Sequence, residues 1–191
     1  MKIEPKFITK IAGTLLVISL VVAALLGVVN GVTKDKIAAI NAENTAVAMN
    51  AVVSVENAEF NPLEASDALK AAASAYGTLD SIYEVKDGGN VGGYTVKVIA
   101  SGSQGSIEMI VGVDAAGAVT GVSVVDHSET SGIGTKVTGN VDGVLDQFKG
   151  MSGAGSLVVG SNVDAISGAT VSTKGVTAGV NAALAAVEAL G

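Results

Sequence analysis

The feature that constrains this chain most is an uninterrupted apolar run near its N-terminus. Residues 11–29 carry no charged side chain. As a helix rising about 1.5 Å per residue, the run spans roughly 28 Å, enough to cross the hydrocarbon core of a bilayer. A cleaved signal peptide would have a shorter apolar region followed by a cleavage site with small residues, and residues 30–34 offer no convincing one. The run predicts an uncleaved transmembrane helix over residues 11–32.

The lysines around this run predict its orientation. Lys2, Lys6 and Lys10 precede it, and Lys34 and Lys36 follow it. Together with the free amino terminus, the small excess predicts that residues 1–10 are cytoplasmic and that the rest of the chain lies outside the cell membrane. The absence of Cys suits an extracytoplasmic domain.

Composition excludes several kinds of site. With no Cys, the chain has no disulfide, thiolate metal site or iron–sulfur cluster of its own, and a single His does not make a usual zinc site. Every cationic side chain is Lys, so an anion must be held mainly by backbone donors. The formal net charge of −7 argues against a nucleic-acid partner.

The segment 33–80 is predicted to be a juxtamembrane helical region. Residues 36–53 are rich in Ala and continue the helical pattern, and residues 66–76 form a second helix that Ser66 caps. Between them, the Asn61-Pro62 step predicts a loop.

From residue 82 the pattern changes to short β-branched runs separated by Gly-rich turns, which predicts an antiparallel meander. With helices before and after it, the domain is predicted to be α+β, with the helices on one face of the sheet. Residues 141–151 predict a short amphipathic helix, and residues 156–159 and 163–166 predict the last strands. The four predicted meander strands are 82–86, 94–100, 106–114 and 119–126.

Small residues and hydroxyls then lead into the last helix. Asp164-Ala165-Ile166-Ser167-Gly168-Ala169-Thr170 precedes apolar residues at helical spacing, and Ser172 or Thr173 is the expected N-cap. The free N–H groups of a first helical turn and the positive end of its dipole can hold a phosphate. The pattern therefore predicts an anion site beside Thr170.

The same residues resemble the flavinylation motif of the FMN-binding domain in the G subunit of Rnf electron-transport complexes; the C subunit of the sodium-pumping NADH:quinone reductase has a similar domain. The resemblance implies that Thr170 bears one FMN through a phosphoester bond made by a separate flavin transferase. Ser167, Gly168 and Ala169 would form the turn around it. Asp164 would be structural or would present the motif to the transferase.

A second motif supports this resemblance. The run 127–134 matches the His-x-Glu-Thr-Pro-Gly-[Leu/Ile]-Gly loop of that family, with Ser131 in place of proline. Relatives more often have an aromatic residue within the segment 101–105, and here it is missing. The resemblance covers residues 82–190, and we expect an FMN-binding domain over 81–191. The further flavin-site residues that it implies are His127, Glu129, Thr130, Gly132 and Gly134, although the first three could instead shape the turn.

By this resemblance the chain is a membrane-anchored flavoprotein subunit that relays electrons within an Rnf-type ferredoxin:NAD⁺ oxidoreductase coupled to ion translocation. Its partners would be the other membrane and redox subunits. A single span without charge cannot form an ion path, so pumping would belong to those partners.

Two other functions remain open on sequence grounds, and a third is disfavoured. A surface-anchored, pilin-like protein explains the anchor but gives no reason for the two motifs to occur together. A stand-alone membrane flavin reductase has the same sequence features as a complex subunit. A hydrolase using His127, Ser167 and Asp126 is disfavoured, because adjacent strand residues point to opposite faces and no nucleophile elbow is present.

Overall fold

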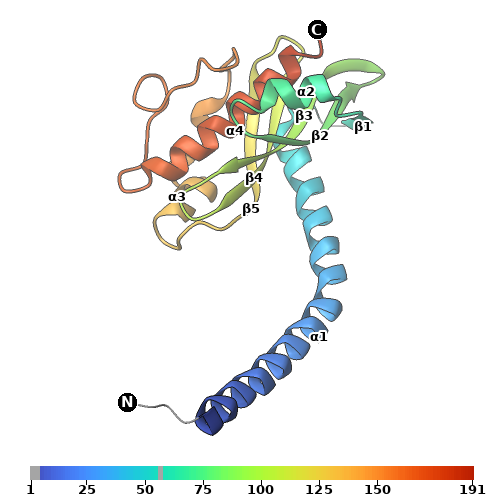
Figure 1. Cartoon of the computed structure of the whole chain (residues 1–191). Coiled ribbons are helices and arrows are strands. Elements are labelled where there is room, and N and C mark those ends of the chain that lie inside the picture. Colours follow the sequence, from blue (N-terminus) through green and yellow to red (C-terminus); the bar gives the residue numbers. More distant parts are fainter. Residues whose placement is uncertain (1–4, 56–57) are drawn as a thin grey trace. The chain divides into compact units, whose positions relative to one another are not determined.

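The computed structural model describes residues 5–55 and 58–191, which belong to two compact units, Met1–Glu43 and Asn44–Gly191. Helix α1 (Pro5–Val52) contains both the predicted membrane span and the predicted helix after it, without a break (Figure 1). Over Thr9–Val52 it is long and apolar enough to cross a membrane, with a mean hydropathy of 2.7 in its most apolar window. Part of the predicted cytoplasmic segment, residues 1–4, lies outside the described residues.

The second unit is built on a five-stranded antiparallel sheet in which each strand pairs with the next along the chain. The predicted meander is confirmed, and the α+β class with it. The edge strand β1 was not predicted, because the Asn61-Pro62 step indicated a loop. Proline is tolerated in an edge strand, where its missing N–H breaks no ladder. The strands are β1 (Glu59–Leu63), β2 (Thr78–Asp87), β3 (Asn90–Ser101), β4 (Ser106–Asp114) and β5 (Val119–His127).

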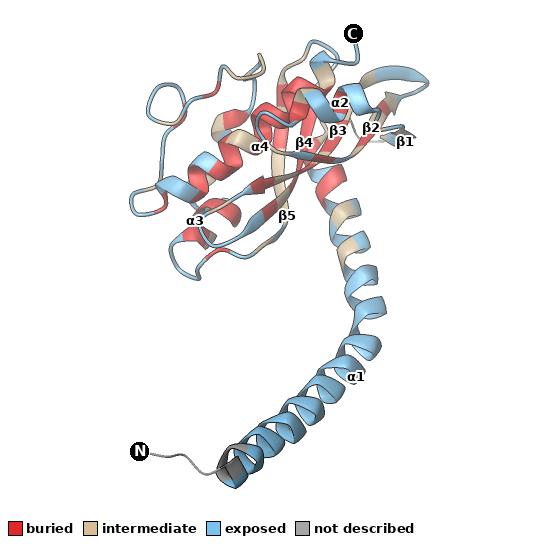
Figure 2. Cartoon of the chain, viewed as in Figure 1, coloured by how far each residue is buried: buried red, intermediate tan, exposed pale blue. Residues whose placement is uncertain are grey.

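Alternating side chains on the sheet supply two separate cores. Figure 2 shows buried residues along the strands, along α4 (Thr170–Glu188) and at the end of α1 next to the sheet. One face carries Met109 and Val111, which belong to the same core as buried residues of α2 (Asp67–Ala73) and α4. On the other face Ile110 packs against Met49 and Val52 from the end of α1. The expectation that helices cover one face only is therefore wrong. As predicted, Ser66 caps α2 by accepting a hydrogen bond from the N–H of Leu69.

Two glycines make room for the end of α1 on that second face. A Cβ at Gly112 would overlap the Val52 carbonyl oxygen, and a Cβ at Gly121 would lie 3.1 Å from the Val52 Cα. The Thr120 hydroxyl donates to the same carbonyl. Since the last carbonyls of a helix lack intrahelical partners, this bond satisfies one of them.

The segment after β5 is less regular than predicted. It contains α3 (Gly134–Thr138) and two 3₁₀ turns, Val141–Gly143 and Asp146–Phe148, in place of one amphipathic helix over 141–151. Left-handed backbone at Asn140 (φ 51°) and Asp142 (φ 58°) interrupts the helical path. Phe148 is buried as expected, whereas Val141 is exposed.

The predicted last strands, 156–159 and 163–166, are not formed. One isolated bridge joins Val159 to Val163, and Asn181 of α4 holds this segment instead. Its side-chain oxygen accepts from the N–H of Gly155 at 2.9 Å, and its amide donates to the Leu157 carbonyl at 2.9 Å. The apolar face predicted for the last helix is correct at Val176, Val180 and Leu184, all buried.

Candidate functional site

The predicted motif is a tight turn that leads directly into α4. The N–H of Ala169 donates to the Ile166 carbonyl at 2.9 Å, and Gly168 has φ +82° at the third position of this turn. A type II turn requires positive φ there, which glycine adopts without steric cost. The helix begins at Thr170, with Ala169 in the cap position, so the expectation that Ser172 or Thr173 is the cap was wrong.

Hydroxyl groups in the first turn of α4 differ in what they do. Ser172 and Thr173 are buried; the first donates to Glu129 and the second to the Ala169 carbonyl at 3.0 Å. Thr170 is exposed, and among the described residues no group pairs with its hydroxyl. Within the same part of the chain, no protein acceptor meets the N–H groups of residues 170–172. The first turn thus presents one free hydroxyl beside free backbone donors.

The second motif forms the loop from β5 into α3. The Thr130 carbonyl accepts from the N–H of Gly134 at 3.1 Å, and the N–H of Gly132 (φ +84°) donates to the Thr135 hydroxyl at 2.9 Å. Half-buried His127 accepts at Nδ1 from the N–H of Glu129 at 3.2 Å. The loop therefore forms a hydrogen-bonded turn with Ser131 at the position where the resembled motif has proline.

The two motifs meet at a pocket of about 340 Å³, within the range of small-molecule sites. Six predicted site residues line it: Glu129, Thr130, Gly134, Gly168, Ala169 and Thr170. The other four, His127, Gly132, Asp164 and Ser167, lie outside its lining. Sequence reasoning missed five lining residues: Ser103, Gln104, Ile133, Val171 and Ser172. Ile133 lies inside the second motif, and the glycine-flanked loop 101–105 had drawn attention only for its missing aromatic.

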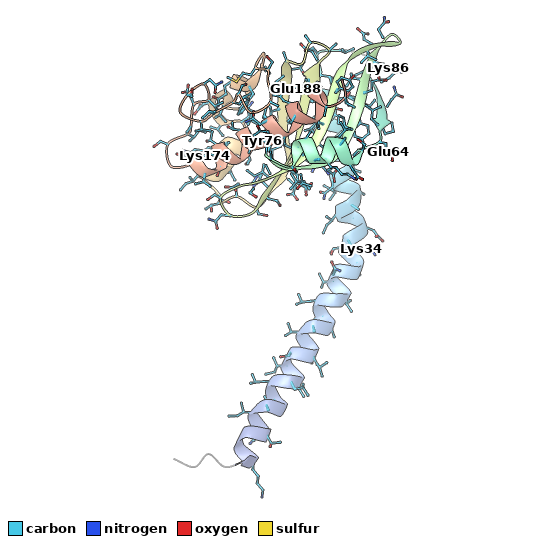
Figure 3. The ribbon with its side chains drawn as sticks, turned by 45° about the horizontal axis from the view of Figure 1, so that its top comes forward. Lys34, Glu64, Tyr76, Lys86, Lys174 and Glu188 are labelled. Carbon is cyan, nitrogen blue, oxygen red and sulfur yellow. The ribbon has the colours of Figure 1, made fainter. Side chains whose placement is uncertain are left out.

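This pocket combines polar and apolar surfaces. Ile133 and Val171 are about half exposed, at 51% and 56%, although both are apolar. Backbone donors of the first turn of α4 lie on one side, and the loop of Ser103 and Gln104 forms another. Among its lining residues none is cationic. Exposed Lys174, one turn along α4, instead lines a separate groove with Tyr76. Both residues are labelled in Figure 3.

Asp164 lies on the far side of the turn, where its backbone is fixed by Gln147. The N–H of Asp164 donates to Gln147 Oε1 at 2.7 Å, and Gln147 Nε2 donates to the Asp164 carbonyl at 3.2 Å. The Asp164 side chain is exposed beside a second hollow of about 350 Å³ that Lys136 and Asp142 also line. The contacts of Asp164 thus fix where the motif begins, outside the first pocket.

The hydrolase arrangement is not assembled. His127 Nδ1 accepts a backbone N–H, and the Asp126 carboxylate accepts from the N–H of His127 at 2.8 Å. In the part of the chain that the structure describes, no hydrogen bond links Ser167 to either residue.

Comparison with known proteins identifies the class of this domain. The FMN-binding domain family matches residues 102–185, from the β3–β4 loop to the penultimate turn of α4, and so includes every residue that lines the pocket. The second unit is thus an FMN-binding domain on a chain with one long apolar helix. In the crystal structure of Shewanella oneidensis NqrC, 53% of each chain aligns at 28% identity with a TM-score of 0.44.

Two relatives identify the family more closely. The G subunit of the Na⁺-translocating ferredoxin:NAD⁺ oxidoreductase complex of Acetobacterium woodii is 37% identical over 94% of this chain and 91% of its own. The G subunit of an ion-translocating oxidoreductase complex of Methanosarcina acetivorans is 33% identical over 97% of both chains. The chain belongs to the family of G subunits of Rnf-type ion-translocating oxidoreductase complexes.

Proposed function

We propose that this subunit carries one FMN, joined to Thr170 by a phosphoester bond, and relays electrons through it. The observation that carries the proposal is the state of the hydroxyls at the start of α4: Thr170 is exposed and faces the pocket, while Ser172 and Thr173 are buried and already donate to protein acceptors. Attachment joins Thr170 Oγ1 to the phosphorus of a flavin donor, breaks the bond from that phosphorus to its leaving group, and releases the hydroxyl proton. A flavin transferase would catalyse this step.

The pocket fits the parts of FMN. The free N–H groups of residues 170–172 and the positive end of the α4 dipole suit the phosphodiester charge, a contribution of about 0.3–1 kcal/mol. Ile133 and Val171 offer apolar surface to the ring system, and Thr130, Ser103 and Gln104 offer polar groups at its edges. His127, Gly132 and Gly134 shape the loop that carries Thr130, while Ser167 and Asp164 set the turn.

Bound FMN supplies one- and two-electron redox chemistry, and the chain supplies its position. No acid–base dyad faces the pocket among the described residues, which suits electron relay better than substrate turnover. We propose that electrons pass between this flavin and other redox subunits of a ferredoxin:NAD⁺ oxidoreductase, the activity named for the Acetobacterium relative. The ion path would lie in those partners, because residues 11–29 carry no charge.

Intact mass and in-gel fluorescence after denaturation test the attachment on protein made together with a flavin transferase. We expect an added mass of FMN minus water, lost in Thr170→Ala and kept in Ser161→Ala, which removes an exposed hydroxyl outside the motif. An unmodified mass and no fluorescence, with the transferase active on another substrate, would refute covalent attachment.

The proposed orientation places the N-terminus in the cytoplasm and the FMN-binding domain outside. Because the chain has no Cys, single cysteines report topology without background. In intact cells a membrane-impermeant maleimide should label exposed Ala116→Cys and spare Lys6→Cys. The reverse pattern would overturn the orientation and leave the flavin proposal standing.

A further inference from the structure

One buried carboxylate joins two walls of the pocket. Glu129 is only 8% exposed. Its Oε1 accepts from the N–H of Ser103 at 2.7 Å and from the N–H of Gln104 at 3.3 Å, and its Oε2 accepts from the Ser172 hydroxyl. The side chain thus ties the β3–β4 loop, the loop after β5 and the first turn of α4 together.

The chain leaves space for this carboxylate on both sides. A Cβ at Gly102 would overlap Oε1, and a Cβ at Gly134 would lie 2.6 Å from Oε2, closer than real Cβ atoms approach other heavy atoms. Both glycines flank the pocket loops, and Gly134 lines the pocket itself. The carboxylate also lies beside the first turn of α4, where the helix dipole favours a negative charge. Three donors and two glycines therefore fit a carboxylate at this place.

We infer that Glu129 is the positioning residue of the pocket. It holds Ser103 and Gln104 against the first turn of α4, so that two walls are in place before the flavin is attached. Since both of its oxygens accept hydrogen bonds from protein donors on two walls of the pocket, Glu129 acts through these neighbours. This inference rests on the proposed function, because it takes the pocket to be the flavin site.

Hydrogen–deuterium exchange of the full chain, in detergent and without flavin, tests whether Glu129 holds the loop of Ser103 and Gln104 in place. In Glu129→Ala the amides of Ser103 and Gln104 lose a charged acceptor, and we expect them to exchange about tenfold faster or more. Glu129→Gln keeps an acceptor for both amides and an amide group that can donate to Ser172, so its exchange should stay close to wild type. Ser172→Ala removes one bond and should give a smaller increase. Unchanged exchange of this loop in Glu129→Ala would overturn the inference.

Visible circular dichroism and flavin fluorescence anisotropy of the flavin-loaded chain test positioning itself. Both signals should fall in Glu129→Ala and Ser172→Ala and be retained in Glu129→Gln. Ser128→Ala, an exposed neighbour in the same loop, is the control and should match wild type. Faster loop exchange with unchanged flavin signals would show a structural role only and overturn positioning. If Glu129→Ala does not fold, Ser172→Ala decides alone. A chain that never acquires flavin refutes the proposed function. The exchange result still decides whether Glu129 holds the loop of Ser103 and Gln104 in place.

Discussion

The turn before α4 makes a sharp prediction, because Gly168 is needed for its backbone angle and not for space. Its φ is +82°, and the nearest atom to a Cβ built there, Cγ2 of Ile133, is 3.8 Å away, an ordinary contact. An alanine in left-handed backbone costs about 1–2 kcal/mol, and reduced freedom of the unfolded chain returns about 0.4–1 kcal/mol. Gly168→Ala should therefore lower the free energy of unfolding by no more than about 1.6 kcal/mol.

Gly117 provides a matched control. Its φ is +83° in the β4–β5 turn, and a Cβ there meets nothing within 4 Å. Denaturant unfolding should show the same small loss for Gly117→Ala and Gly168→Ala, and mass spectrometry should show reduced flavin attachment only for Gly168→Ala, because that turn precedes Thr170. A loss of several kcal/mol for Gly168→Ala alone would mean that space, not φ, is limiting. Full attachment in Gly168→Ala would refute the link between the turn and Thr170.

Four further substitutions test the packing that supports the site. Gly175→Val should destabilise the domain by about 1–3 kcal/mol, measured by denaturant unfolding, because its Cβ would lie 2.5 Å from the Ser101 carbonyl oxygen and push α4 off the sheet. Asn181→Leu leaves the buried N–H and carbonyl of Leu157 without hydrogen-bond partners. We therefore expect the free energy of unfolding to fall by about 2–4 kcal/mol and proteolysis within residues 152–163 to become faster. Gly112→Ala should lower the free energy of unfolding by about 1–3 kcal/mol, because it displaces the end of α1. Gly121→Ala should lower it by less, because the new Cβ would lie 3.1 Å from the Val52 Cα. Equal losses of unfolding free energy in Gly112→Ala and Gly121→Ala would contradict the idea that Gly112 provides the space for the Val52 carbonyl.

The sequence predicts what depends on local pattern. Alternation and glycine turns located β2 to β5, and helical spacing located the core face of α4, because both patterns repeat within a few residues. The same reasoning failed at 141–151, where left-handed backbone at Asn140 and Asp142 breaks a helix that its apolar residues suggest. It failed again at 156–166, where Asn181, from the following helix, supplies the partners that a strand would have found in a sheet.

In the site, too, some features follow from the local sequence and others depend on distant residues. Thr170 and its turn follow from a short motif, and the structure brings six of ten predicted residues to one pocket. The role of Glu129 depends on Ser172, 43 residues further along the chain, and on room left by Gly102 and Gly134. No local pattern carries such a contact. Glu129 was expected either to touch the flavin or to shape a turn, and the structure adds that both of its oxygens are occupied by protein donors.

The absence of a cation among the pocket's lining residues gives a physical reason for the proposed covalent bond. Backbone N–H groups at one helix start contribute only about 0.3–1 kcal/mol toward an anion, so nearly all of the roughly 8 kcal/mol that micromolar binding requires would have to come from contacts with the rest of the flavin. Exposed Lys174 faces another groove and, as a solvated charge, adds little. A pocket with such weak phosphate contacts would lose free FMN outside the cytoplasm, where the proposed orientation puts the domain, whereas the proposed phosphoester to Thr170 would retain the flavin whatever the affinity. Thr170→Ala chain refolded with excess FMN should therefore lose its flavin on dialysis, as absorbance at the flavin band will show; retention of one equivalent would refute this explanation.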